Sequence, residues 1–145
     1  MSYDLFNNLQ EWGCVLDQVQ KIREDGALDS HQEGLARLAR YPFNWQLRET
    51  ALRAIAELKR PTEEVLRIAV QIMADENNDL ETRILAGNAV SSVLSNGHGT
   101  ISDVARFAAT ECIRDLLARQ EPPVLHSSAR MWYQCVVSVP TPTGR

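Results

Sequence analysis

The chain has 145 residues, which suits one domain able to bury most of its apolar surface on folding. The hydrophobic fraction of 44% and the charged fraction of 23% are ordinary for a globular protein, and the aromatic fraction of 6% indicates a core of Leu, Ile, Val and Ala. The net charge of −4 argues against a surface that binds a nucleic-acid backbone.

The composition along the chain points to the cytoplasm. No stretch of eighteen apolar residues is present, and the first residues, MSYDLFNNLQEWG, resemble neither a signal peptide nor a membrane anchor. Cys14, Cys112 and Cys135 are odd in number and form no CxxC pattern, which disfavours a disulfide framework or a zinc site and favours a reducing compartment. We expect all three thiols to be small core residues.

Apolar residues at three- and four-residue steps predict seven helices and no paired strands. The predicted helices span residues 4–24, 30–40, 44–58, 62–74, 80–95, 101–119 and 123–137. Together they form one all-α domain over residues 1–137. The remaining residues, 138–145, contain two prolines and no periodicity, and we expect a flexible tail there.

Polar residues mark most of the predicted helix starts. Asp4, Asn44 and Thr62 are expected N-caps, the turn at 75–79 should cap the fifth helix, and Asp29 or Ser30 should cap the second. Thr100 or Ser102 should open the sixth helix, after a glycine-rich exit at 97–99.

In the last two helices the apolar spacing predicts broad inward faces. For 101–119 and 123–137 these faces comprise Val104, Phe107, Ala108, Cys112, Ile113, Leu116 and Leu117, and then Leu125, Ala129, Trp132, Tyr133 and Val136.

A helical repeat is visible in the middle of the chain. LRETALRAIAEL at 47–58 returns as TRILAGNAVSSV at 82–93, with Arg48 on Arg83 and Ala51 on Ala86. Small alanines spaced three residues apart in each copy, as A-x-x-A, allow neighbouring helix axes to approach closely, as in stacked helical pairs.

On these residues the sequence resembles the HEAT-repeat proteins of the short bacterial type, well over residues 30–95 and more loosely to 137. The resemblance implies a right-handed α-solenoid of roughly three helical pairs. Its inner layer would hold helices 44–58, 80–95 and 123–137, its outer layer 30–40, 62–74 and 101–119, and helix 4–24 would cap one end. Pro42 and Asn77 stand where the family often has Asp, and His126 stands where Arg is expected. A generic seven-helix bundle is the alternative.

The repeat alignment separates scaffold from candidate binding residues. Arg48 and Arg83, in the first turns of their helices, are expected to pair between successive turns of the stack. The positions off the core on the implied inner helices are the candidate partner-binding residues: Glu49, Arg53, Asn88, Ser91, Arg130 and Gln134.

Other candidates carry less chemistry. His31, His98 and His126 have no second ligand three or four residues away, so we expect no metal site, and His98 between two glycines is the one His that suits a switch on a loop. Trp45, beside Pro42 and Phe43, would form an aromatic hot spot if all three are exposed, and otherwise would staple the turn.

The sequence therefore favours a non-catalytic adaptor or scaffold that binds a peptide or partner subunit on the inner helical face, with no cofactor and no membrane contact. No base stands at fixed spacing from a cysteine, which disfavours nucleophilic catalysis. An enzyme or enzyme subunit resembling the HEAT-like bilin lyases is the alternative, and nucleic-acid binding is a third. A homodimer is also open.

Overall fold

The computed structural model describes residues 12–97 and 99–137, and this part of the chain contains helices but no strand. The elements are α1 (Trp12–Glu24), the short 3₁₀ helix η1 (Leu28–His31), α2 (Gln32–Arg40), α3 (Trp45–Ile55), α4 (Glu63–Ala74), α5 (Leu80–Asn96), α6 (Asp103–Ala118) and α7 (Pro123–Val137). The predictions of an all-α fold and of seven helices are confirmed within these ranges. The start of the predicted helix 4–24, His98 and the predicted tail lie outside the described residues.

Most helix starts follow the predicted caps. The side chains of Asn44, Thr62 and Asp79 accept hydrogen bonds from backbone N–H groups in the first turns of α3, α4 and α5. For α6 the cap is Ser102, whose hydroxyl accepts from the Ala105 N–H. Each cap satisfies a donor that the helix itself cannot satisfy.

The start of the second helix was predicted wrongly. Residues 28–31 form the 3₁₀ turn η1, and α2 begins at Gln32 without a side-chain cap. Asp29 bonds elsewhere, because its carboxylate accepts from the backbone N–H groups of Lys59 and Arg60 at 3.2 and 2.6 Å. The expected cap therefore ties η1 to the loop before α4.

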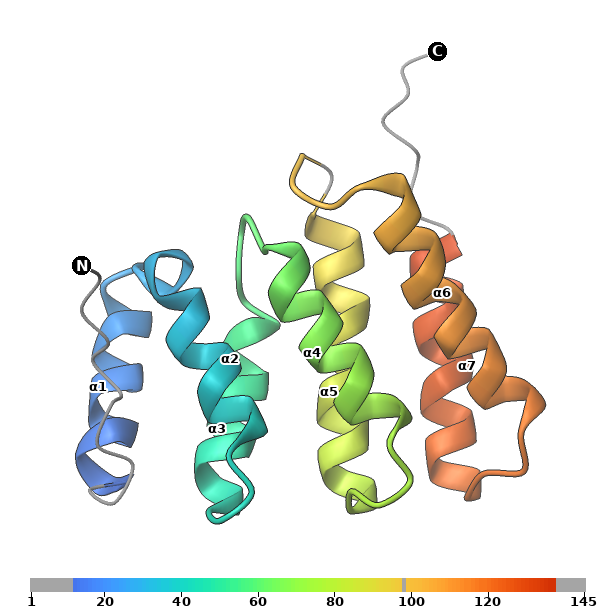
Figure 1. Cartoon of the computed structure of the whole chain (residues 1–145), viewed down its shortest axis with the longest axis horizontal. Coiled ribbons are helices and arrows are strands. Elements are labelled where there is room, and N and C mark those ends of the chain that lie inside the picture. Colours follow the sequence, from blue (N-terminus) through green and yellow to red (C-terminus); the bar gives the residue numbers. More distant parts are fainter. Residues whose placement is uncertain (1–11, 98, 138–145) are drawn as a thin grey trace.

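Successive helices reverse direction and alternate between two layers (Figure 1). In one layer α1 contacts α3, α3 contacts α5 and α5 contacts α7; in the other α2 contacts α4 and α4 contacts α6. The pairs α2/α3, α4/α5 and α6/α7 join the layers, and in Figure 1 α2, α4 and α6 lie in front of their partners. Helices α3 and α5 therefore lie side by side and run in the same direction, as the repeat predicted.

The core fills the space between the two layers. The repeat alanines, Ala51 in α3 and Ala86 in α5, are completely buried, as are Leu35, Leu47 and Ile55. Because an alanine side chain is small, its backbone can approach the neighbouring helix closely. The repeated Ala positions thus favour close packing around α3 and α5.

One polar contact recurs in every pair of helices. Arg48 Nε donates to the Ala39 carbonyl at the end of α2 (3.1 Å), and Arg83 Nε donates to the Met73 carbonyl near the end of α4 (3.0 Å). In the third pair His126 Nε2 lies 2.9 Å from the Leu117 carbonyl oxygen, so this nitrogen must carry the proton. These side chains satisfy carbonyls that the helix ends leave free.

Arg48 and Arg83 also reach the next turn of the stack. An Arg48 guanidinium nitrogen donates to Asn78 Oδ1 at 3.2 Å, and Arg83 makes a two-pronged contact with the Glu121 carboxylate at 3.2 and 3.4 Å. The side chains of Arg83 and Glu121 are both almost fully buried. Both arginines thus have the scaffold role that their position in the repeat indicated.

Two groups of predicted core residues are exposed instead. In α6 the buried arc consists of Ala109, Ile113 and Leu116, while Val104 and Phe107 are 80% and 67% exposed and Ala108 is also exposed. The apolar positions of α6 cover more of its circumference than the neighbouring helices can bury.

The prediction that all three cysteines lie in the core was also wrong. Cys14 and Cys135 are exposed, on the solvent sides of α1 and α7, and Cys112 is half-buried. In α7, by contrast, Leu125, Ala129 and Trp132 are buried as predicted, with Tyr133 and Val136 half-buried.

Candidate functional site

The six candidate binding residues lie on α3, α5 and α7, in one layer of the fold. On α3, Glu49 and Arg53 form an ion pair at 3.7 Å, with Arg53 largely exposed and Glu49 mostly covered. Arg53 also lines a cavity of about 260 Å³ between α1 and α3. This part of the predicted surface is polar and accessible.

On α5, Asn88 is engaged with the neighbouring helix. Its Oδ1 accepts a hydrogen bond of 2.7 Å from the indole Nε1 of Trp132 in α7. The other candidate on this helix, Ser91, is half-buried, and its backbone carbonyl accepts from the Ser95 hydroxyl. The structure therefore brings Asn88 to α7 as part of the packing between the helices.

On α7, His126 makes the contact expected of its repeat position, but Arg130 is not the residue that matches Arg53 and Asn88. Arg130 and Gln134 are exposed, and an Arg130 guanidinium nitrogen lies 3.3 Å from His126 Nδ1. Arg53 and Asn88 each stand five residues after the Arg that bonds the preceding helix end, and five residues after His126 the chain has Met131. Met131 is exposed, so the position on α7 that matches Arg53 and Asn88 is apolar.

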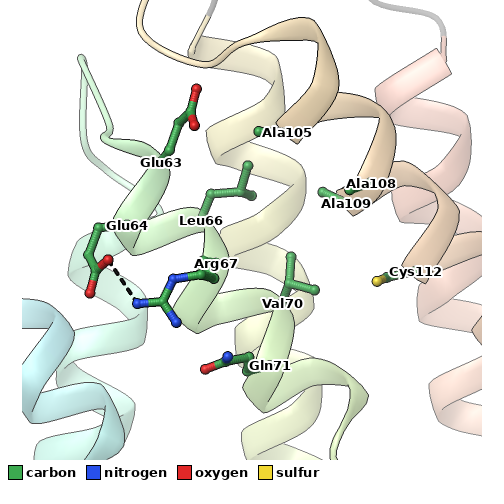
Figure 2. Close-up of a pocket in the computed structure, with 10 residues that line it drawn as sticks. All are labelled: Glu63, Glu64, Leu66, Arg67, Val70, Gln71, Ala105, Ala108, Ala109 and Cys112. Carbon is green, nitrogen blue, oxygen red and sulfur yellow. Dashed lines mark hydrogen bonds and ion pairs between the residues drawn. The ribbon is translucent and has the colours of Figure 1, made fainter.

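A second cavity lies in the other layer, between α4 and α6 (Figure 2). It has a volume of about 380 Å³, which is within the range of binding pockets. We call it the α4–α6 groove; its lining residues are Glu63, Glu64, Leu66, Arg67, Val70, Gln71, Ala105, Ala108, Ala109 and Cys112. Figure 2 shows Leu66 and Val70 pointing from α4 toward α6, where the opposite wall consists of alanines and Cys112.

The apolar lining extends beyond the groove onto the surface of α6. Val104 stands four residues before Ala108, so both lie on one side of the helix, whereas the exposed Phe107 is turned about 100° away from Ala108. Sequence reasoning missed this surface because it assigned all the apolar positions of α6 to the core. The available signal was their number, which exceeds what a single buried stripe requires.

The charged residues around the groove are mainly acidic. Glu63 accepts a hydrogen bond of 2.7 Å from the Ser102 N–H, and Glu64 pairs with Arg67 at 2.8 Å on the same helix. On the α6 side, burial raises the pKa of the Cys112 thiol above its usual value, and the charges of Asp115 and Glu111 raise it further. A raised pKa keeps the thiol protonated, which makes it a weak nucleophile.

A second exposed apolar surface lies at the turn between α2 and α3. Phe43 is 83% exposed and Trp45 64% exposed, and Pro42 is exposed beside them. The Tyr41 ring packs edge-on against Phe43, with centroids 5.5 Å apart. Of the two interpretations of these residues, exposure favours the aromatic hot spot over the staple.

Comparisons with protein families, with curated proteins and with solved structures gave no match. Among the described residues, no helix is both long and apolar enough to cross a bilayer, and no three His, Cys, Asp or Glu side chains are grouped as a metal site requires.

Proposed function

We propose that this protein is a non-catalytic interaction module, a short HEAT-like stack whose α4–α6 groove receives apolar side chains of a partner protein. The observation that carries the proposal is the apolar α4–α6 groove, beside which the exposed Val104 lies on the same side of α6 as Ala108. Contiguous exposed apolar surface is uncommon on monomeric proteins and marks interaction sites.

The two-layer stack and its recurring contact support the HEAT-like part of the proposal. Arg48, Arg83 and His126 each bond a carbonyl near the end of the preceding helix, so the three pairs repeat one local design. A stack of this kind holds its surface side chains on rigid helices, which suits binding.

Site-specific photo-crosslinking in the native host tests the proposal. A photoreactive amino acid replaces Ala108, in the groove, and in a matched variant replaces Arg53, on the layer of α3, α5 and α7. We expect irradiation to give a discrete protein adduct from position 108, identified by mass spectrometry. The adduct should weaken when Val104, on the same side of α6 as Ala108, is changed to Ser, since this exposed residue contributes little to folding.

The crosslinking results separate the alternatives. An adduct from position 53 and none from 108 would place binding on the face predicted from the sequence. No adduct above the unirradiated background from either position would reject the interaction module.

A further inference from the structure

The walls of the α4–α6 groove restrict the backbone conformation of any peptide that lies in it. The α6 wall offers Ala105, Ala108, Ala109 and Cys112, none of which is a strong hydrogen-bond partner. A peptide backbone placed against such a wall loses its water, and unpaired N–H and C=O groups there are costly. An α-helix satisfies these groups internally, so a helix suits this wall better than an extended strand.

The length of the apolar surface fits a short helix. From Val104 to Cys112 there are nine residues of α6, and the eight steps between them cover about 12 Å at 1.5 Å per residue. A partner helix lying along it would contribute apolar side chains from two to three turns. Amphipathic helices bind in apolar grooves in this way, through residues spaced three and four apart.

The charges beside the groove determine which helix would fit. Glu64 and Glu111 are each paired with an arginine on their own helix, at 2.8 and 3.6 Å. Glu63, at the start of α4, and Asp115, near the end of α6, have no cation within salt-bridge distance in the described part of the chain. The nearby cation Arg119 is bound to Glu76 and Glu121. Each end of the groove thus has a carboxylate that forms no ion pair within the described residues.

We propose that the occupant of the α4–α6 groove is a basic amphipathic helix of a partner protein, with its apolar face on Leu66, Val70 and the α6 alanines and its cations beside Glu63 and Asp115. This inference rests on the proposed function, because it identifies what the groove binds. Complementary charge around an apolar contact also favours this class of partner over neutral or acidic helices.

Two synthetic peptides of about 14 residues, near the length at which an isolated helix becomes stable, test the inference. One is an amphipathic Leu–Lys peptide, and the other has the same Leu positions with Glu in place of Lys. Binding to the full chain is measured by fluorescence anisotropy at low and moderate salt. We expect the Lys peptide to bind at least about tenfold more tightly, and its affinity to fall as salt is raised.

Variants of the chain locate the binding. Glu63→Gln with Asp115→Asn should weaken the Lys peptide about fivefold, since each exposed charge pair contributes modestly. The matched control, Asp17→Asn with Glu81→Gln, removes the same charge from α1 and α5 in the other layer and should leave affinity unchanged. Ala108→Trp, at an exposed position, should fill the groove and abolish binding, with circular dichroism confirming the fold.

Each other outcome overturns the inference in a distinguishable way. Equal or tighter binding of the Glu peptide, blocked by Ala108→Trp, would reject a basic partner while leaving the groove as a docking site. Peptide binding that survives Ala108→Trp would reject the groove itself. Failure of both peptides to bind would reject the inference. The proposed function would then be tested separately, by the crosslinking experiment at position 108. Self-association in sedimentation that Ala108→Trp removes would assign the groove to a second copy of this chain.

Discussion

Gly87 in α5 is a position where one added methyl group should have a large effect. An alanine Cβ there would lie 2.0, 2.2 and 2.4 Å from three atoms of the Trp132 six-membered ring. Gly87 is buried, and the indole is also buried and held by its hydrogen bond to Asn88, so the ring cannot move aside without shifting α7.

The expected change in stability follows from two opposing effects. Gly87→Ala gains about 1 kcal/mol in helix propensity, whereas overpacking a buried site costs about 1–3 kcal/mol and more when a rigid ring is the obstacle. With contacts near 2 Å the overpacking should prevail, giving a net loss of about 2 kcal/mol and a melting temperature lower by about 4–8 °C.

Urea unfolding, followed by circular dichroism and tryptophan fluorescence, measures this change. Gly13→Ala is the matched control, because an added Cβ at Gly13 in α1 meets no atom within 4 Å, and it should stabilise the chain by up to about 1 kcal/mol. In Gly87→Ala with Trp132→Leu, the two losses should fall short of additive by at least about 0.5 kcal/mol, since removing the ring removes the clash. A stabilising Gly87→Ala, or full additivity, would refute the proposed packing of Trp132 on Gly87.

Three further predictions concern polar contacts and exposure. Glu121→Ala should cost about 3 kcal/mol in urea unfolding, because it leaves Arg83 buried without its carboxylate, and Arg83→Met with Glu121→Leu should recover most of that loss; a cost under about 1 kcal/mol would contradict the pairing. Asp79→Ala should cost about 1 kcal/mol at neutral pH through loss of the α5 cap. The hydrogen bond from the Thr82 hydroxyl holds the pKa of Asp79 below its ordinary value of 3.8, so this stabilisation is complete above pH 3.8 and is lost as the pH falls through the lower pKa of the folded state. The difference in unfolding free energy between Asp79→Ala and the unmodified chain should therefore narrow at low pH, and a constant difference would contradict the assignment. Trp45→Phe should change the unfolding free energy by less than about 0.5 kcal/mol while removing emission that acrylamide quenches, and a larger destabilisation would mean that Trp45 is packed.

The fold could be predicted from the sequence where local chemistry determines it. The caps at Asn44, Thr62 and Asp79 bond backbone donors two or three residues away, and such contacts are visible in the sequence itself. Asp29 was misassigned because its partners are the N–H groups of Lys59 and Arg60, thirty residues further along. Periodicity carries no information about contacts at that distance.

The candidate site was harder to predict, because a groove is a property of two helices. The alignment selected polar residues such as Arg53 and Asn88 from single helices, and it could not show that the Asn88 side-chain Oδ1 already accepts a hydrogen bond from Trp132. Likewise Leu66 and Ala105 belong to different helical pairs, and only the packed structure shows the unfilled space between them. The sequence does show more apolar residues in α6 than a core requires, but not which of them lack a neighbour.

The contacts at the two ends of the α4–α6 groove explain why it stays open. At one end Glu63 of α4 accepts the Ser102 N–H, just before α6 begins. At the other, Arg119, just after α6, pairs with Glu76, just after α4, at 3.0 Å. With both ends tied, tilting α6 onto Leu66 and Val70 would break at least one of these contacts. A preformed groove spares a partner part of the ordering cost of binding, so these ties favour docking even though each exposed contact adds little to stability.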